Sequence, residues 1–271
     1  MIRAGVSSAC LYPKLLEESV YDLAVNGIDH IEIFVNTDCE LEKQYISGIA
    51  QTLKRFEVSC RSMHPFTSPI EPMLFFSGYE RRLRDALEYY KKYFNAMNIL
   101  GAEIFVFHGN KRIVELSAEN YCECYSKLVD VGKEFGITVA QENVSRCQSA
   151  TLSFMKSMVD IMGDDAKFVL DTKQAVRAEE NSFSILRTLK KHIAHVHISD
   201  HGPMGDCLMI GKGRFNIKQL FNVLNEEGID CSVMLELYRN NFDGISDLVD
   251  NYTSLCEMIK NTSDEKKRRR L

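Results

Sequence analysis

Four residues of the kind that bind divalent metal ions stand where short apolar segments give way to polar residues: Glu142, Asp171, His197 and Glu236. Three carboxylates held close together repel one another unless they bind a cation or share protons. Mg²⁺, Mn²⁺ and Co²⁺ accept carboxylate oxygens and an imidazole nitrogen within one coordination shell. If the fold brings the four side chains together, we expect them to hold one divalent ion. A hydrogen-bonded polar cluster without a metal is the alternative.

The segments that carry these residues alternate regularly with helix-length amphipathic segments, which is the pattern of βα units around a parallel sheet. The chain has 271 residues, and a (β/α)₈ barrel typically needs about 250. No glycine-rich phosphate loop follows the first apolar segment, which argues against a dinucleotide-binding sheet. We therefore predict an α/β fold, a closed (β/α)₈ TIM barrel, with strands at 2–6, 30–35, 58–64, 103–108, 137–142, 167–171, 193–198 and 231–236.

All strands of such a barrel end at the same face, so residues far apart in sequence become neighbours there. This face would collect the four candidate ligands together with His64 and His108. His195 lies two residues before His197 and points to the same side of its strand. We expect His195 to be an interior histidine that supports its neighbour. For Glu32, on the second strand, a substrate contact and a hydrogen-bonded residue of the barrel both remain open.

Two further segments each have two interpretations. The connection at 67–78 holds four consecutive bulky apolar residues, from Met73 to Phe76, which either pack onto the barrel or cover the site. The segment 262–271 contains a run of basic residues and has no apolar periodicity. We predict one barrel domain over 1–261 and a flexible basic tail over 262–271, for which a nucleic-acid or targeting role is the alternative.

The bulk properties narrow the classes of function. The net charge of −5 gives no general attraction to phosphate backbones, which argues against a nucleic-acid partner. No apolar run approaches the roughly 20 residues that span a bilayer, so we expect no membrane segment. The nine cysteines are scattered and odd in number, as is typical of thiols in a reducing compartment, and the first residues lack the features of a signal peptide. We expect a cytoplasmic protein, and a homo-oligomer is compatible with these properties.

Seven short motifs occur in order at or near the predicted strand ends: Met63-His-Pro-Phe66, Val106-Phe-His-Gly109, Gln141-Glu-Asn-Val144, Leu170-Asp-Thr-Lys-Gln-Ala175, His195-Val-His-Ile-Ser-Asp200, Met209-Ile-Gly-Lys-Gly-Arg-Phe215 and Leu235-Glu-Leu237. In this order they resemble the xylose isomerase-like TIM barrel superfamily, over nearly the whole chain. That superfamily contains sugar isomerases, ketose 3-epimerases, inosose dehydratases and DNA-repair enzymes of the endonuclease IV type.

The resemblance implies one divalent ion (Mn²⁺, Mg²⁺, Co²⁺ or Zn²⁺) held by Glu142, Asp171, His197 and Glu236. It also implies that Glu142 and Glu236 act as catalytic acid and base. They would move a proton next to the carbonyl of a small carbohydrate through an enediolate. The candidates for substrate binding are then His64, His108, Glu32, Lys173, Gln174 and Arg214.

The sequence departs from two branches of this superfamily. Endonuclease IV-type enzymes use three zinc ions, and two of their zinc-binding histidines are missing here, where Gln174 and Cys207 stand. Ketose 3-epimerases carry a glutamate, a histidine and an arginine where this chain has Gln148, Gln174 and Pro203. The implied metal ligands are therefore retained while the usual substrate contacts are not. We predict a sugar, sugar-phosphate or polyol isomerase or epimerase of unassigned specificity. The alternatives are an inosose-type dehydratase, an endonuclease IV-like phosphodiesterase on abasic DNA, and a non-catalytic sugar-binding barrel.

Overall fold

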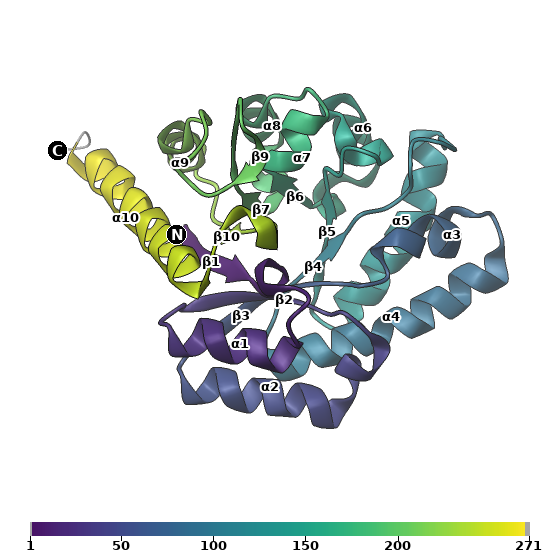
Figure 1. Cartoon of the computed structure of the whole chain (residues 1–271). Helices are drawn as coiled ribbons and strands as arrows, with labels where there is room; N and C mark the ends of the chain where they lie inside the picture. Colours follow the sequence, from purple (N-terminus) through teal and green to yellow (C-terminus); the bar gives the residue numbers. More distant parts are fainter. Residues whose placement is uncertain (1, 269–271) are drawn as a thin grey trace.

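A closed barrel of eight parallel strands forms the centre of the molecule (Figure 1). The computed structural model describes residues 2–268, with side chains up to residue 262. The strand order around the barrel is β1-β10-β7-β6-β5-β4-β3-β2. Both ends of every predicted strand lie within one residue of the observed ones, and the predicted (β/α)₈ TIM barrel is confirmed. The strands are β1 (Arg3–Ser7), β2 (His30–Phe34), β3 (Ser59–His64), β4 (Ile104–Phe107), β5 (Thr138–Glu142), β6 (Phe168–Asp171), β7 (Ile193–Ile198) and β10 (Ser232–Leu235).

Helices surround the barrel (Figure 1), and local sequence signals start and stop several of them. Ser117 accepts a hydrogen bond from the N–H of Asn120 at the start of α5, and Gly101 ends α4 in the left-handed conformation that favours glycine. Among the described residues, no helix is long and apolar enough to cross a membrane. The main helices are α1 (Leu16–Val25), α2 (Lys43–Arg55), α4 (Glu80–Leu100), α5 (Ala118–Glu134), α6 (Leu152–Met162), α8 (Ser182–Leu189), α9 (Ile217–Glu226) and α10 (Ile245–Arg268).

The connection between β3 and α4 contains a short helix, α3 (Glu71–Phe76), that carries the run of bulky apolar residues. Phe75 packs edge to face against Phe107 of β4, with ring centroids 5.3 Å apart, and Phe76 stacks on Tyr121 of α5 at 4.6 Å. Both phenylalanines are buried, whereas Met73 is 48% exposed. The apolar run therefore packs this connection onto the barrel, which is the first of the two interpretations given above.

The last helix, α10, extends further than the sequence pattern predicted. We expected a flexible tail to begin at residue 262, but the helix continues to Arg268. Glu265, Lys266 and Lys267 have high helix propensity, so a helix can continue here without an apolar stripe. Residues 269–271 lie outside the described part of the chain. The division into a domain and a tail stays a prediction.

Candidate metal centre

The four candidate ligands come from four strands that are consecutive in the barrel, β5, β6, β7 and β10. Glu142 and Asp171 are the last residues of their strands, and Glu236 directly follows its strand. One ligand atom from each of these three and from His197 lies within 4.8 Å of the others. His197 Nδ1 is 3.5 Å from Glu142 Oε1 and 3.6 Å from Glu236 Oε2. The structure therefore brings together the four residues that the sequence pointed to.

Hydrogen bonds from the backbone hold Asp171 so that one of its two carboxylate oxygens, Oδ2, faces this cluster. Its Oδ1 accepts the N–H groups of Lys173 (2.7 Å) and Gln174 (3.1 Å), because the short helix α7 (Thr172–Arg177) begins directly after β6. Asn143 accepts the N–H of Asp171 at 2.7 Å and donates to its carbonyl at 3.1 Å, which fixes the backbone. The second carboxylate oxygen, Oδ2, receives no hydrogen bond from the described residues, and Lys173 Nζ lies 3.3 Å from it.

A hydrogen-bond partner inside the barrel also orients the imidazole ring of His197. Its Nε2 lies 3.0 Å from Glu32 Oε2, so Nδ1 points into the cluster and has no hydrogen-bond partner among the described residues. Glu32 is fully buried, and it also accepts a hydrogen bond from Ser62 (2.7 Å) and lies 3.3 Å from His195 Nε2. His195 is thus an interior histidine beside its neighbour, as expected. For Glu32, a substrate contact and a hydrogen-bonded residue of the barrel were both open. In the structure it lies in the barrel interior beneath the cluster and is hydrogen-bonded there.

The cluster carries a strong negative field. Burial raises the pKa of the Asp171 carboxyl to about 7, against the nearby ammonium of Lys173. Burial also opposes protonation of His197, but the charges of Glu32 and Glu236 outweigh it and hold the His197 pKa well above its usual range. The negative charges that hold this proton on the imidazole would also attract a metal cation, which would replace the proton. Asp171 Oδ2 and His197 Nδ1 both face the cluster and receive no hydrogen bond from the described residues, so the donor set fits a divalent metal ion.

His64 and His108 lie beside the cluster and share Glu142 with it. Their Nε2 atoms are 2.8 Å apart, and Glu142 Oε2 is 2.7 Å from His108 Nε2 and 4.0 Å from His64 Nε2. Burial opposes the ionisation of Glu142, but His108 and His197 hold its pKa well below the usual range. Burial and the charge of His108 lower the pKa of His64 to about 4. These three residues form a second group that could hold a metal ion.

A buried carboxylate that the sequence did not single out supports His108. Glu71, in α3, accepts the backbone N–H groups of His108 (2.9 Å) and Gly109 (2.7 Å) through Oε2. It is fully buried, and this burial raises its pKa to about 7. The only sequence signal was that Glu71 is the one charged residue of the connection at 67–78. Glu71 therefore positions the backbone at the end of β4, from which His108 projects.

A cavity of about 740 Å³ opens over the cluster. Its polar lining includes the two glutamates of the cluster, the two neighbouring histidines, Lys173 and Gln174, while aromatic and proline side chains such as Tyr12, Phe34 and Phe66 form much of its wall. Gln174 accepts hydrogen bonds from the N–H and hydroxyl of Ser145. Of the candidates for substrate binding, Glu32 and Arg214 are not among the residues that line this cavity.

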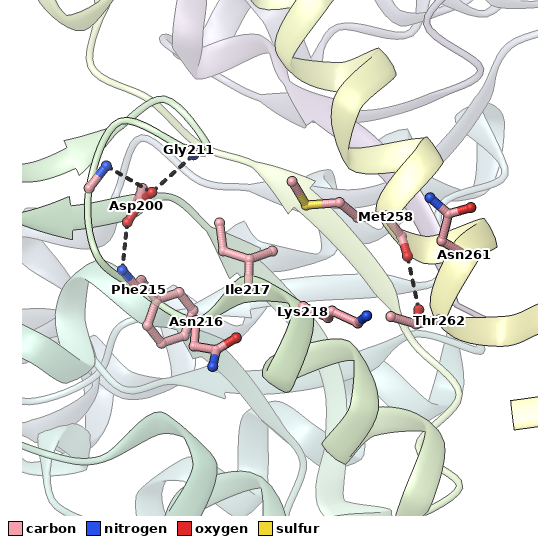
Figure 2. A pocket seen from close by; sticks show the side chains of 10 residues that line it. Asp200, Gly211, Phe215, Asn216, Ile217, Lys218, Met258, Asn261 and Thr262 are labelled. Carbon is pink, nitrogen blue, oxygen red and sulfur yellow. Dashed lines mark hydrogen bonds between the residues drawn. The ribbon is translucent and has the colours of Figure 1, made fainter. Parts of the chain in front are cut away.

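Arg214 belongs to a loop that is held by a different side chain. Asp200, in the hairpin of β8 (Asp200–Gly202) and β9 (Gly205–Leu208), accepts the N–H groups of Gly211, Gly213 and Phe215 at 2.9 to 3.0 Å (Figure 2). A side chain on Gly213 would collide with the Asp200 carboxylate, so only glycine fits there. This loop, α9 and α10 line a separate cavity of about 530 Å³ (Figure 2). Within the described structure, the carboxylate of Asp200 is satisfied by the loop itself.

Comparison with known proteins identifies the family. Residues 20–262 match the xylose isomerase-like TIM barrel family. The chain belongs to that family. A relative in Methanocaldococcus jannaschii, an uncharacterised protein, is 25% identical over 248 residues, which cover 87% of this chain and 83% of that protein.

Solved structures of this xylose isomerase-like fold superimpose on nearly the whole chain. A D-tagatose 3-epimerase-like protein has a TM-score of 0.81 at 22% identity, over 97% of this chain and 99% of that one. A protein named IolI, solved with a bound zinc atom, has a TM-score of 0.78 at 16% identity, over 96% of this chain and 99% of that one. At these identities the likeness shows the shared barrel fold.

Proposed function

We propose that this member of the xylose isomerase-like family is a divalent-metal-dependent isomerase or epimerase that acts on a sugar, a sugar phosphate or a polyol-derived ketone. The observation that supports the proposal most is the position of Glu142 and Glu236. Both belong to the ligand cluster, both line the cavity above it, and they come from β5 and β10, which are separated by β6 and β7 in the barrel. Two carboxylates can therefore reach a bound substrate from different sides.

The metal would be held by Glu142, Asp171, His197 and Glu236. When bound, a divalent ion would polarise a carbonyl oxygen and an adjacent hydroxyl oxygen of the substrate, which acidifies the C–H bond between them. The protein's own part is proton transfer. One glutamate would take the proton from carbon, and the other would return a proton to the opposite face in an epimerase or to the neighbouring carbon in an isomerase.

Two features of the site suit Glu142 and Glu236 to this role. Burial opposes the ionisation of both, but His108 and His197 beside Glu142, and Lys173 and His197 beside Glu236, lower their pKa values. Both side chains are therefore carboxylates at neutral pH, which is the form that can take a proton from carbon. Phe34, which stacks on His64 at 4.7 Å, and the other aromatic side chains of the wall would exclude water from the reacting atoms.

Exchange of carbon-bound hydrogen tests this proposal directly. Incubation of a panel of ketoses, ketose phosphates and inososes with the protein and Mn²⁺ in heavy water should place deuterium on carbon. Glu142→Gln and Glu236→Gln should each slow the exchange by at least about 100-fold, the usual contribution of a general acid or base. Glu115→Gln, on an exposed loop outside the active-site cavity, is the matched control. Absence of exchange across the panel, with Mn²⁺ shown to be bound, would contradict the proposal. Release of water to give an absorbing enone would instead identify a dehydratase on the same ligands.

Phosphodiester cleavage is a second candidate, because the group of His64, His108 and Glu142 could hold another ion next to the first. Gln174 and Cys207 stand where such enzymes have two zinc-binding histidines, and the side-chain oxygen of Gln174 accepts a hydrogen bond from Ser145. A gel assay on duplex DNA with one abasic site, together with a count of bound zinc ions, tests this candidate. If sugars raise the Tm of the protein but none of them is turned over, a non-catalytic sugar-binding barrel is the remaining hypothesis.

A further inference from the structure

One lysine lies inside the ligand cluster. Lys173 is only 4% exposed, and its Nζ donates a hydrogen bond to Glu236 Oε2 at 3.0 Å and lies 3.3 Å from Asp171 Oδ2. Both carboxylates belong to the four residues that would hold the metal. A positive charge of the protein itself is therefore in contact with two of the four candidate ligands.

We infer that Lys173 is an internal cation that competes with the divalent ion for Asp171 and Glu236, and so sets how tightly the metal is bound. In the metal-free protein its ammonium holds the two carboxylates together. When a metal is present, the ammonium weakens the hold of the ligand set on the ion. This inference rests on the metal site of the proposed function and adds a residue that tunes its affinity.

The first argument is that the ammonium and a metal would use the same oxygen atoms. Asp171 Oδ1 is occupied by two backbone N–H groups at the start of α7, so Oδ2 is the oxygen left to bind a cation. Lys173 Nζ lies beside that oxygen. A carboxylate oxygen that shares its electrons with an ammonium is a weaker ligand for a second cation.

The second argument is the balance of charge. The cluster contains the carboxylates of Glu142, Asp171 and Glu236, while Glu32 below it is paired with His195 and His197. His108 Nε2 lies 2.7 Å from Glu142, while the ammonium of Lys173 faces the other two carboxylates. Without the ammonium, the ligand set would carry one more unit of negative charge toward the metal. At a separation of a few ångströms, one unit of charge changes the affinity for a divalent ion about tenfold or more, equivalent to about 1.4 kcal/mol.

The third argument is that the side chain of Lys173 borders the cavity, into which its ammonium can move. Lys173 lines the active-site cavity, and its Nζ lies 5.1 Å from the ring centroid of Tyr238, which also lines the cavity and is partly exposed. An aromatic face stabilises an ammonium outside the carboxylate cluster. The side chain can therefore move toward the cavity when a metal takes the oxygens, without unpacking the barrel.

The inference can be tested by titrating the metal-free protein with Mn²⁺ alone and measuring the dissociation constant by isothermal titration calorimetry. Lys173→Met removes the charge and keeps most of the chain length, and Lys173→Gln is a second neutral variant that keeps a hydrogen-bond donor. Both should bind Mn²⁺ about tenfold more tightly than the unmodified protein. Lys212→Met, the same change at an exposed lysine of the loop held by Asp200, should leave the affinity unchanged. In the presence of a chelator, Lys173→Met should also unfold at a lower temperature, because three carboxylates lose their counter-charge.

Each outcome of the titration decides a different point. If the unmodified protein binds Mn²⁺ and both neutral variants bind it equally or more weakly, the inference is overturned while the metal site stands. If only the variants bind Mn²⁺, Lys173 is confirmed as the competing cation, and the metal dependence in the proposed function fails. If none of the proteins binds Mn²⁺, the metal site fails and this inference fails with it.

Discussion

Replacement of Glu71 by glutamine should remove part of the pH dependence of the free energy of unfolding. Glu71 is fully buried under the end of β4, and burial raises its pKa from 4.5 to about 7. Because the folded state holds this proton more tightly than the unfolded state, the stabilisation is fully present below pH 4.5 and is lost as the pH rises through about 7. At about 1.4 kcal/mol per pKa unit, the loss amounts to about 3 kcal/mol.

Glutamine resembles the protonated form at every pH. Its carbonyl oxygen can accept the N–H groups of His108 and Gly109, and its amide can face the hydroxyl of Tyr90, which lies 3.5 Å from Glu71 Oε1. Relative to the unmodified protein, Glu71→Gln should therefore gain about 2 to 3 kcal/mol of stability between pH 5 and pH 8.

Denaturation by urea at both pH values, with a chelator in all samples, measures this change. Glu115→Gln alters the formal charge equally at an exposed position and serves as the reference for general charge effects. A stability difference between the variant and the unmodified protein that is the same at pH 5 and pH 8 would refute the reasoning.

Two further predictions concern the metal site. Mn²⁺ at 100 times its dissociation constant should stabilise the folded protein by about 2.7 kcal/mol and raise its Tm by about 5 °C in a thermal melt, because it binds only the assembled cluster. An unchanged Tm with Mn²⁺, Mg²⁺, Co²⁺ and Zn²⁺ would argue against a metal site. Glu32→Gln should weaken Mn²⁺ binding about 10- to 100-fold in calorimetry, since Glu32 orients His197. Glu40→Gln, at a buried carboxylate that accepts the N–H of Asn36, is the control, and equal affinities of the two variants would show that the loss is not specific to His197.

The convergence of the ligands could be predicted because it follows from topology. In a parallel barrel all strands end at one face, so a strand that ends at or just before Glu142, Asp171 or Glu236 places that side chain at the mouth, wherever the strand occurs in the sequence. The orientation of each side chain could not be predicted in this way. The immediate start of α7 decides which oxygen of Asp171 faces the cluster. Glu32, which lies 165 positions away in the sequence, decides which nitrogen of His197 does so.

Contacts that exist only in the folded chain account for what the sequence analysis missed. Glu71 accepts a hydrogen bond from the backbone N–H of His108, 37 positions away in the sequence, and no local sequence pattern predicts that contact. Arg214, inside the motif from Met209 to Phe215, was a candidate for substrate binding at the mouth. Asp200 ties that motif into a separate loop, and a hairpin lies between it and β7. Lys173 lines the cavity, so its role in substrate binding stays a prediction. The contact of its ammonium with Asp171 and Glu236 depends on α7 and could not be predicted.

The polar chain that runs through the centre of the barrel has a consequence for protein engineering. Ser62, Glu32 and His195 fill interior space below His197 with hydrogen-bonded and charged groups. Exchange of buried ion pairs for well-packed apolar residues of similar volume is often neutral or stabilising, by about 1 to 4 kcal/mol. A variant library selected only for heat resistance should therefore collect apolar substitutions at Glu32 and His195. The selected variants would be more stable, but Glu32 would no longer orient His197 toward the metal site. Selection for stability therefore needs a parallel screen for metal binding.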